Sequence, residues 1–324
     1  MNGRTRFLET MHFGHPDRVP YFEEGIRKDV LKAWRKQGLE EAADLANMFT
    51  TDQREEIDLD VDPRPWPKCW PSSRSDLKAY AASINPDDRS RLPGNWKKKL
   101  ATWKERQHVL MMRVHIGFFE TMGVEGWQRF HELMVLMHDD PGFVCEMMRV
   151  NGEFVAFLTE HILRDVEIDA AVFSEPIGDN HGPLISPKMY ADFVLSSYRP
   201  ILDVLHRHSV EIIILRTYAN ARLLIPVLLE HGLDCLWACE VNSEAMDYRS
   251  LRKEFGRDLR LIGGVDLDAL RAGREAIRRE VEEKVPPLLA QGGYVPLADG
   301  RVRADIPFEN YLFYRQLLEK VTSS

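Results

Sequence analysis

One pattern occurs three times between Val210 and Asp266, and it constrains the fold more than any other part of the sequence. Each copy is a short apolar run that ends in a charged residue: VEIIILR (Val210–Arg216), LDCLWACE (Leu233–Glu240) and LRLIGGVD (Leu259–Asp266). Segments with apolar residues at helical spacing separate the three runs. This alternation is typical of βαβ units, which build a parallel sheet. A charge that closes a buried parallel strand lies at its C-terminal end, where enzymes with this architecture place their chemistry.

Five further segments have the composition of short strands. They are Val19–Glu24, Arg54–Asp62, Val109–His115, Ile168–Glu175 and Gly292–Asp299. Eight strands, most of them followed by a helix, favour a (β/α)8 TIM barrel over an open doubly wound sheet in a chain of 324 residues. Barrels of this size often form one domain, so residues 1–324 are predicted to be a single domain. No G-x-G-x-x-G sequence follows the first strand, which argues against a dinucleotide site.

Residues 63–104 are the least regular part of the chain. They contain six prolines and four of the seven tryptophans. A long insertion without a core of its own is usually functional or disordered, and the tryptophans argue against disorder. We therefore predict a packed lid or rim insertion within the barrel. The alternative is a surface excursion that aromatic residues hold in place.

The charge and the cysteines limit the classes of partner and compartment. A formal net charge of −8 argues against nucleic acid and anionic membranes as the main partner. No run approaches 18 apolar residues and no signal peptide is recognisable, so a cytoplasmic location is expected. The four cysteines lack the spacing of a disulfide scaffold and fit reduced thiols. A homodimer is the expected assembly, because it is the commonest one.

Charged and polar residues gather at, or just beyond, the predicted strand ends. The catalytic candidates are Glu175, His181, Glu240 and Asp266. The candidates for substrate binding are His115, Arg216, Tyr218, Asn220, Asp299, Arg301 and Arg303. Carboxylates can act as general acids or bases, and arginines can bind a substrate carboxylate with two hydrogen bonds. Each acid alone could instead cap the next helix, but buried charges that coincide at one rim favour a functional site.

A metal ion is a further possibility at this rim. Glu175, His181, Cys239 and Glu240 have side chains that bind zinc and lie near one another in the predicted barrel. Cys235 does not belong to this set, because four residues along a strand separate it from Cys239 by roughly 13 Å. Cys235 is therefore predicted to belong to the core.

Several segments spread over most of the chain form a recognisable set. They are RFLETMHFGHPDRVP, GFFETMG, GWQRFHELMVLMHDDP, GPLISPKMYADFVLSSYRPI, NARLLIPVLLEHGLD, WACEVNSEAMDYRSLRKEFG, LIGGVDLDALRAG and DIPFENY. Together they resemble the uroporphyrinogen decarboxylase superfamily, which includes haem-pathway decarboxylases and corrinoid-linked methyltransferases. The resemblance implies a (β/α)8 barrel with its active site at the C-terminal rim.

The sequence departs from both well-known activities of that superfamily. The Arg-rich segment after the first strand of the haem-pathway decarboxylases is replaced by YFEEGIRKDV, in which only Arg27 could substitute. Their late Gly-His-Gly segment is replaced by Ala-Asp-Gly at residues 298–300. The His-x-Cys zinc pair of the thiol-activating methyltransferases is replaced by Arg216 and Tyr218, and neither is a usual zinc ligand.

The remaining similarity is closer to the corrinoid-linked methyltransferase and O-demethylase branch. It implies transfer of a methyl group from a small methylated or methoxylated, anionic substrate to a corrinoid. The chain has no D-x-H-x-x-G corrinoid-binding sequence, so a separate corrinoid protein would be the partner.

Two alternatives to methyl transfer stay open. One is decarboxylation of a tetrapyrrole or another carboxylated substrate without a metal, in which Asp52 or Asp266 stabilises developing positive charge. The other is a barrel that binds a ligand without catalysis, since a fold does not fix a function.

Overall fold

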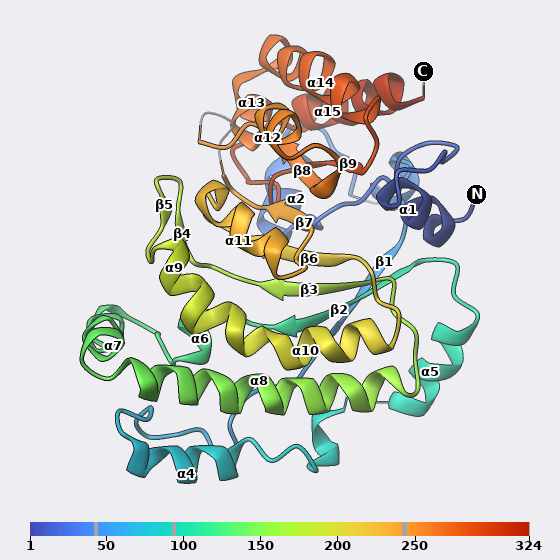
Figure 1. Cartoon of the computed structure of the whole chain (residues 1–324). Coiled ribbons are helices and arrows are strands. Elements are labelled where there is room, and N and C mark those ends of the chain that lie inside the picture. The colour runs from blue at the N-terminus through green and yellow to red at the C-terminus, as the bar shows by residue number, and fades with distance from the viewer. Residues whose placement is uncertain (42–44, 93–94, 242–244, 324) are drawn as a thin grey trace.

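One curled parallel sheet forms the centre of the computed structural model, which describes residues 1–41, 45–92, 95–241 and 245–323 (Figure 1). The strands follow the order β1-β2-β3-β6-β7-β8-β9, and all six pairings are parallel. Their bounds are β1 Arg54–Asp58, β2 Val109–His115, β3 Ala170–Ser174, β6 Ile213–Thr217, β7 Cys235–Ala238, β8 Arg260–Val265 and β9 Tyr294–Ala298. Seven of the eight predicted segments therefore contain a strand.

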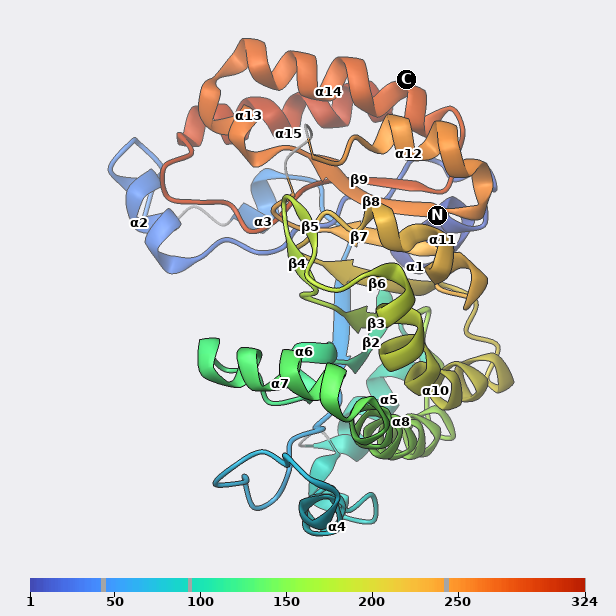
Figure 2. The ribbon, with the colours of Figure 1, turned by 60° about the vertical axis from the view of Figure 1, so that its left-hand side comes forward.

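Helices cover the outer face of the sheet on several sides, as Figures 1 and 2 show together. The larger ones are α7 Trp127–Asp139, α8 Pro141–Leu163, α10 Ser196–Arg207, α12 Tyr248–Phe255, α14 Arg274–Leu289 and α15 Phe308–Thr322. The others are α1 Gly3–Met11, α2 Lys28–Arg35, α3 Leu45–Met48, α4 Arg74–Ser83, α5 Trp96–Lys104, α6 Phe118–Thr121, α9 Pro187–Met189, α11 Ile225–Glu230 and α13 Leu267–Ala272. A short hairpin, β4 Gly178–Asp179 and β5 Gly182–Pro183, follows β3. None of the described helices is both long and apolar enough to cross a membrane.

The strands are apolar on both faces because each face packs against a different core. Side chains alternate along a strand, so Ala171 and Phe173 face the helices whereas Ala170 and Val172 face the interior of the curl. Phe7 and Met11 of α1 join this interior core. Strands buried on both faces are typical of α/β proteins with a parallel sheet.

The prediction of a first strand at Val19–Glu24 is wrong. These residues belong to no strand, and Pro20 has no N–H to donate to a ladder. Phe22 nevertheless packs in the interior core, and the Asp52 N–H donates to the Tyr21 carbonyl at 2.9 Å. Within the described ranges no eighth strand closes the sheet. The α/β fold with a TIM-like curl is confirmed, and the full eightfold barrel is not.

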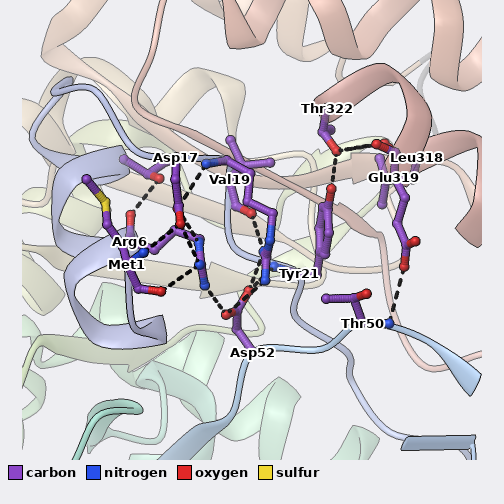
Figure 3. A network of polar contacts seen from close by, with 12 residues as sticks. Met1, Arg6, Asp17, Val19, Tyr21, Thr50, Asp52, Leu318, Glu319 and Thr322 are labelled. Atoms are coloured by element: carbon purple, nitrogen blue, oxygen red, sulfur yellow. Dashed lines mark hydrogen bonds and ion pairs between the residues drawn. The ribbon is translucent and has the colours of Figure 1, made fainter. Parts of the chain in front are cut away.

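A network of charged residues connects the N-terminal segment to the residues just before β1 (Figure 3). Asp52 accepts hydrogen bonds from Arg6 at 2.5 Å, from Arg18 at 2.6 Å and from the Tyr21 N–H at 2.9 Å. The Asp52 side chain is only 6% exposed. Arg6 also pairs with Asp17 at 2.7 Å. Asp52 therefore connects α1 and the segment that follows it to the start of β1.

Replacing Asp52 with alanine is expected to lower the free energy of unfolding by about 2–3 kcal/mol, because a hydrogen bond to a charged group contributes that much. Arg6 keeps Asp17 as a partner, which limits the loss. Urea unfolding measures the change. Asp192→Ala is the control, since this half-exposed acid pairs with Lys188 on the surface and is expected to change stability by less than about 1 kcal/mol. Equal effects of the two changes would contradict the prediction.

The predicted insertion, residues 63–104, contains α4 and α5; its residues 93–94 lie outside the described part of the chain. Figure 1 shows α4 beneath α8, on the side away from the sheet. The buried Arg91 organises the segment by donating hydrogen bonds to the carbonyl groups of Asp60, Asp62, Ser83 and Asn85. Trp103 donates to Glu55 of β1 at 2.8 Å. That residues 63–104 act as a lid stays a prediction.

Candidate active site

A cavity of about 610 Å³ lies at the C-terminal ends of the strands. Figure 2 shows the ribbon with these strand ends and the hairpin β4–β5 turned toward the viewer. The size of the cavity is that of a small-molecule site. The lining is mostly charged and consists of Glu24, Arg27, Arg54, Glu56, Asp58, Arg113, Ser174, Arg216, Tyr218, Cys239, Glu240, Gly300 and Arg301. The C-terminal rim predicted to hold the site therefore contains a cavity of suitable size and polarity.

The alternation of side chains along each strand explains this lining. In three strands an apolar residue of the interior core is followed, two positions later, by a cavity residue. Met111 precedes Arg113, Val172 precedes Ser174, and Ile214 precedes Arg216. Because side chains two apart share a face, the cavity is the polar end of the interior core.

Three ion pairs join residues of the cavity lining. Arg216 donates from both Nη atoms to the two carboxylate oxygens of Glu56, at 2.8 and 2.9 Å. Arg54 pairs with Glu24 at 2.9 Å, and Arg113 pairs with Asp58 at 2.9 Å. Burial lowers the pKa of Arg216, but the hydrogen bonds and charge of Glu56 outweigh it and hold that pKa above its ordinary value. Arg216 is therefore a permanent cation.

Glu240 is the second residue after β7 and has a strained backbone. Its φ angle of 56° lies in the left-handed region, which is costly for a residue with a side chain. Its N–H donates to the carbonyl of Asp299, and the neighbouring Gly300 leaves room for its side chain, since a Cβ there would lie 3.0 Å from the Glu240 Cγ. The loop thus directs a carboxylate into the cavity. Strain of this kind is a feature of functional sites.

Cys239 directly follows β7 and lines the cavity. Burial raises its pKa far above the ordinary value, and the negative charge of Glu24 adds to the effect. Without a bound cation, Cys239 is therefore a neutral thiol.

Glu175 and His115 lie outside the cavity, in a buried cluster between the sheet and the helices. Glu175 accepts hydrogen bonds from Tyr198 at 2.5 Å, from Tyr190 at 3.3 Å and from the Phe118 N–H at 2.9 Å. Burial raises the pKa of Glu175 to about 7. Burial also lowers the pKa of His115 to about 3, so this imidazole is neutral. A register shift between Arg113 and His115 accompanies the change of side-chain direction at the end of β2.

The other candidates divide between the cavity and its surroundings. The candidates that line it are Arg216, Tyr218, Cys239, Glu240 and Arg301. His181 is 95% exposed beside Asp179 in the β4–β5 hairpin, and Asn220 donates to the Ala245 carbonyl. Asp266 caps α13 by accepting the Asp268 N–H, Arg303 pairs with Asp268, and Asp299 accepts the Leu267 N–H. Burial raises the pKa of Asp299 to about 7.

The proposed zinc ligands are not gathered at one point. Cys239 and Glu240 line the cavity, whereas Glu175 is in the buried cluster and His181 is on an exposed hairpin. Over the described ranges, no three His, Cys, Asp or Glu side chains are grouped so that they could hold a metal ion. The four donors do not fit a zinc ion.

Besides Gly300 and Glu24, which ends a predicted strand, six lining residues lie outside the set of sequence candidates: Arg27, Arg54, Glu56, Asp58, Arg113 and Ser174. A signal for three of them exists in the sequence, because REEID places charged residues two apart at 54, 56 and 58. Asp52, the alternative catalytic acid, is bound by Arg6 and Arg18 and does not line the cavity.

The curled parallel sheet and the charged cavity at its C-terminal edge define a TIM-like α/β protein with an enzyme-like site. The family model described as uroporphyrinogen decarboxylase (URO-D) matches residues 121–312, which is more than half of the chain. The chain belongs to the URO-D family, as the resemblance in sequence predicted, and this membership indicates an enzyme. The matched region includes Arg216, Tyr218, Cys239, Glu240 and Arg301. No curated protein matches the chain significantly.

Proposed function

We propose that the chain is a methyltransferase of the demethylase type, which moves a methyl group from a small methylated or methoxylated anion to a corrinoid carried by a partner protein. The charge of the cavity is the observation that supports this substrate. Its lining has five arginines and four carboxylates, so the cations exceed the anions by one. That balance suits a substrate with one negative charge. A tetrapyrrole with many carboxylates would face four unfavourable acids.

The lining residues supply two functions that demethylation needs. The five arginines of the lining, Arg301 and Arg27 among them, can bind the anionic group of the substrate. Glu240, held toward the cavity by its backbone, can give a proton to the oxygen or nitrogen that loses the methyl group. The corrinoid, when its carrier protein is bound, supplies the nucleophile that accepts the methyl group. Because the chain has no corrinoid-binding sequence, the carrier must present it at the mouth of the cavity.

The test combines purified protein with free cob(I)alamin and a panel of methoxybenzoates and N-methylated amino acids. Formation of methylcobalamin, followed by its absorbance, supports the proposal, and Glu240→Gln is expected to abolish most of it. Release of CO2 from a carboxylated substrate without methylcobalamin would replace the proposal with decarboxylation. Thermal stabilisation by a ligand without turnover would favour a binding protein.

Two neighbouring arginines provide a matched pair of variants. Arg301→Ala is expected to raise KM about tenfold or more, because it removes a charge-assisted contact to the substrate. Arg303→Ala is expected to leave KM unchanged, since Arg303 does not line the cavity and pairs with Asp268 at 3.2 Å. Steady-state kinetics of both variants with one methylated substrate check this. Equal changes in KM would show that Arg301 does not bind the substrate.

A further inference from the structure

Trp237 lies directly beneath the charged cavity. It is on β7, fully buried, and faces the interior between Cys235 and Cys239. Two cavity arginines rest on its ring: the guanidinium carbon of Arg54 is 4.6 Å from the ring centroid and that of Arg216 is 5.5 Å. These arginines come from β1 and β6, so the indole joins side chains of three strands. Cations over an aromatic face are attracted to it, most strongly over tryptophan.

Carboxylates hold the same two arginines at their edges. Glu24 accepts from Nη2 of Arg54 at 2.9 Å, and Glu56 accepts from both Nη atoms of Arg216. A guanidinium has five N–H donors in one plane. Two donors of Arg216 bind Glu56, which leaves three for other acceptors. A planar group held at one face and one edge can direct its remaining donors in only a few directions.

We propose that Trp237 is a positioning residue that makes the site specific for a carboxylate. The indole fixes the planes of Arg54 and Arg216, and the fixed N–H groups match the two oxygens of a planar carboxylate. This inference rests on the proposed function in one respect, namely that the substrate is an anion. The ion pairs Arg54–Glu24 and Arg216–Glu56 are each neutral overall, so the direction of their N–H donors adds selectivity for a carboxylate to the attraction by the net positive lining.

The indole N–H allows a clean experiment. This N–H is buried, and no atom of the described residues accepts a hydrogen bond from it. Trp237→Phe therefore keeps an aromatic face and leaves no protein acceptor unpaired. Trp237→Leu keeps an apolar side chain but removes the aromatic face. The two variants separate the effect of the face from the effect of lost volume.

The experiment compares wild type, Trp237→Phe and Trp237→Leu by NMR of the arginine Nε–H groups, with Arg54→Lys and Arg216→Lys used for assignment. The aromatic ring is expected to shift both signals in wild type and in Trp237→Phe, and the shifts are expected to disappear in Trp237→Leu. With a methylated carboxylate substrate, Trp237→Leu is expected to raise KM about tenfold with kcat nearly unchanged, whereas Trp237→Phe stays within about threefold of wild type. Thermal unfolding verifies that each variant is folded.

Two results would overturn the inference. One is that Trp237→Leu leaves both arginine signals and KM as they are in wild type. The other is that Trp237→Phe is as impaired as Trp237→Leu, which would assign the effect to lost volume or to the N–H group. Failure of the proposed function is distinguishable, because wild type would then transfer no methyl group while the arginine signals still decide whether Trp237 positions them.

Discussion

Replacing Arg216 with alanine is expected to lower kcat/KM for the methylated substrate at least about thirtyfold, which corresponds to the lower end of the roughly 2–5 kcal/mol lost when one partner of a buried charge pair, here Arg216 with the substrate anion, is removed. The side chain is only 13% exposed and binds Glu56 through two hydrogen bonds. Its loss leaves four arginines and four carboxylates in the lining where there were five and four. The excess positive charge disappears, and Glu56, which keeps only its longer contact with Arg54 at 3.9 Å, repels the anion. Steady-state kinetics with one substrate measure the effect.

Three further variants show whether the ion pair causes the loss. Arg216→Lys keeps the charge without the forked geometry and is expected to fall between wild type and Arg216→Ala. Adding Glu56→Ala to Arg216→Ala removes the carboxylate that has lost its Arg216 partner, so the double variant is expected to regain part of the activity. Arg222→Ala is the control, because Arg222 is a surface residue paired with Glu254. Activity of Arg216→Ala within about threefold of wild type would fall below the loss expected for a buried pair.

Local patterns in the sequence predicted seven strands and the edge of the sheet that carries the cavity. Short apolar runs that end in a charge identified β6, β7 and β8, and with them Arg216 and Glu240. These predictions succeeded because a strand buried on both faces is a continuous apolar run, and the charged residue that closes the run marks the place where the strand leaves the core. The segment Val19–Glu24 has a similar composition, but whether it joins the ladder depends on the backbone of distant residues.

The segment Arg54–Asp62 was predicted correctly to contain a strand, but its residues were not predicted to be part of the site. Glu56 and Asp58 line the cavity, because the polar face of this strand is turned into the curl. Which face is turned inward follows from the packing of Ile57 and Leu59 against the helices. A sequence pattern of period two gives two faces without saying which one is inside.

Side-chain direction beyond a strand end was the least predictable property. His115 and Glu175 both stand at strand ends, and both point toward the helices instead of the cavity. A register shift at the end of β2 accompanies this direction for His115. No local sequence signal identifies such a shift. The direction of His181 is equally hard to predict from local sequence, because its hairpin is held by a distant residue. The Asn220 N–H donates to the Asp179 carbonyl at 2.8 Å.

Replacing Glu175 with alanine is expected to lower the free energy of unfolding at pH 5 by about 4 kcal/mol, since the change opens a cavity and leaves buried donors without an acceptor. Glu175 is fully buried and accepts from Tyr198, Tyr190 and the Phe118 N–H. Urea unfolding at pH 5 measures the loss. Glu254→Ala, on the surface, is the control, and a similar loss there would contradict the assignment of this cluster to the core.

Glu175→Gln gives a pH signature of its own. The pKa of Glu175 is raised to about 7 by burial, so between about pH 4.5 and 7 the folded chain holds a proton that the unfolded chain has released. Stability from this group is therefore lost as the pH rises through that window, by roughly 3 kcal/mol in all. Glutamine cannot ionise, so wild type is expected to lose this much relative to Glu175→Gln between pH 4.5 and pH 8.

The comparison with glutamine is needed because His115 in the same cluster acts in the opposite direction. Its pKa is lowered to about 3 by burial, so its contribution is lost as the pH falls from about 6.5. Both proteins contain His115, Tyr190, Tyr198 and Asp299, and their difference in stability isolates Glu175. Parallel pH profiles would mean that the three hydrogen bonds keep Glu175 ionised in the folded chain. The cluster would then hold a buried negative charge behind the cavity, and the charge balance from which an anionic substrate is inferred would have to include it.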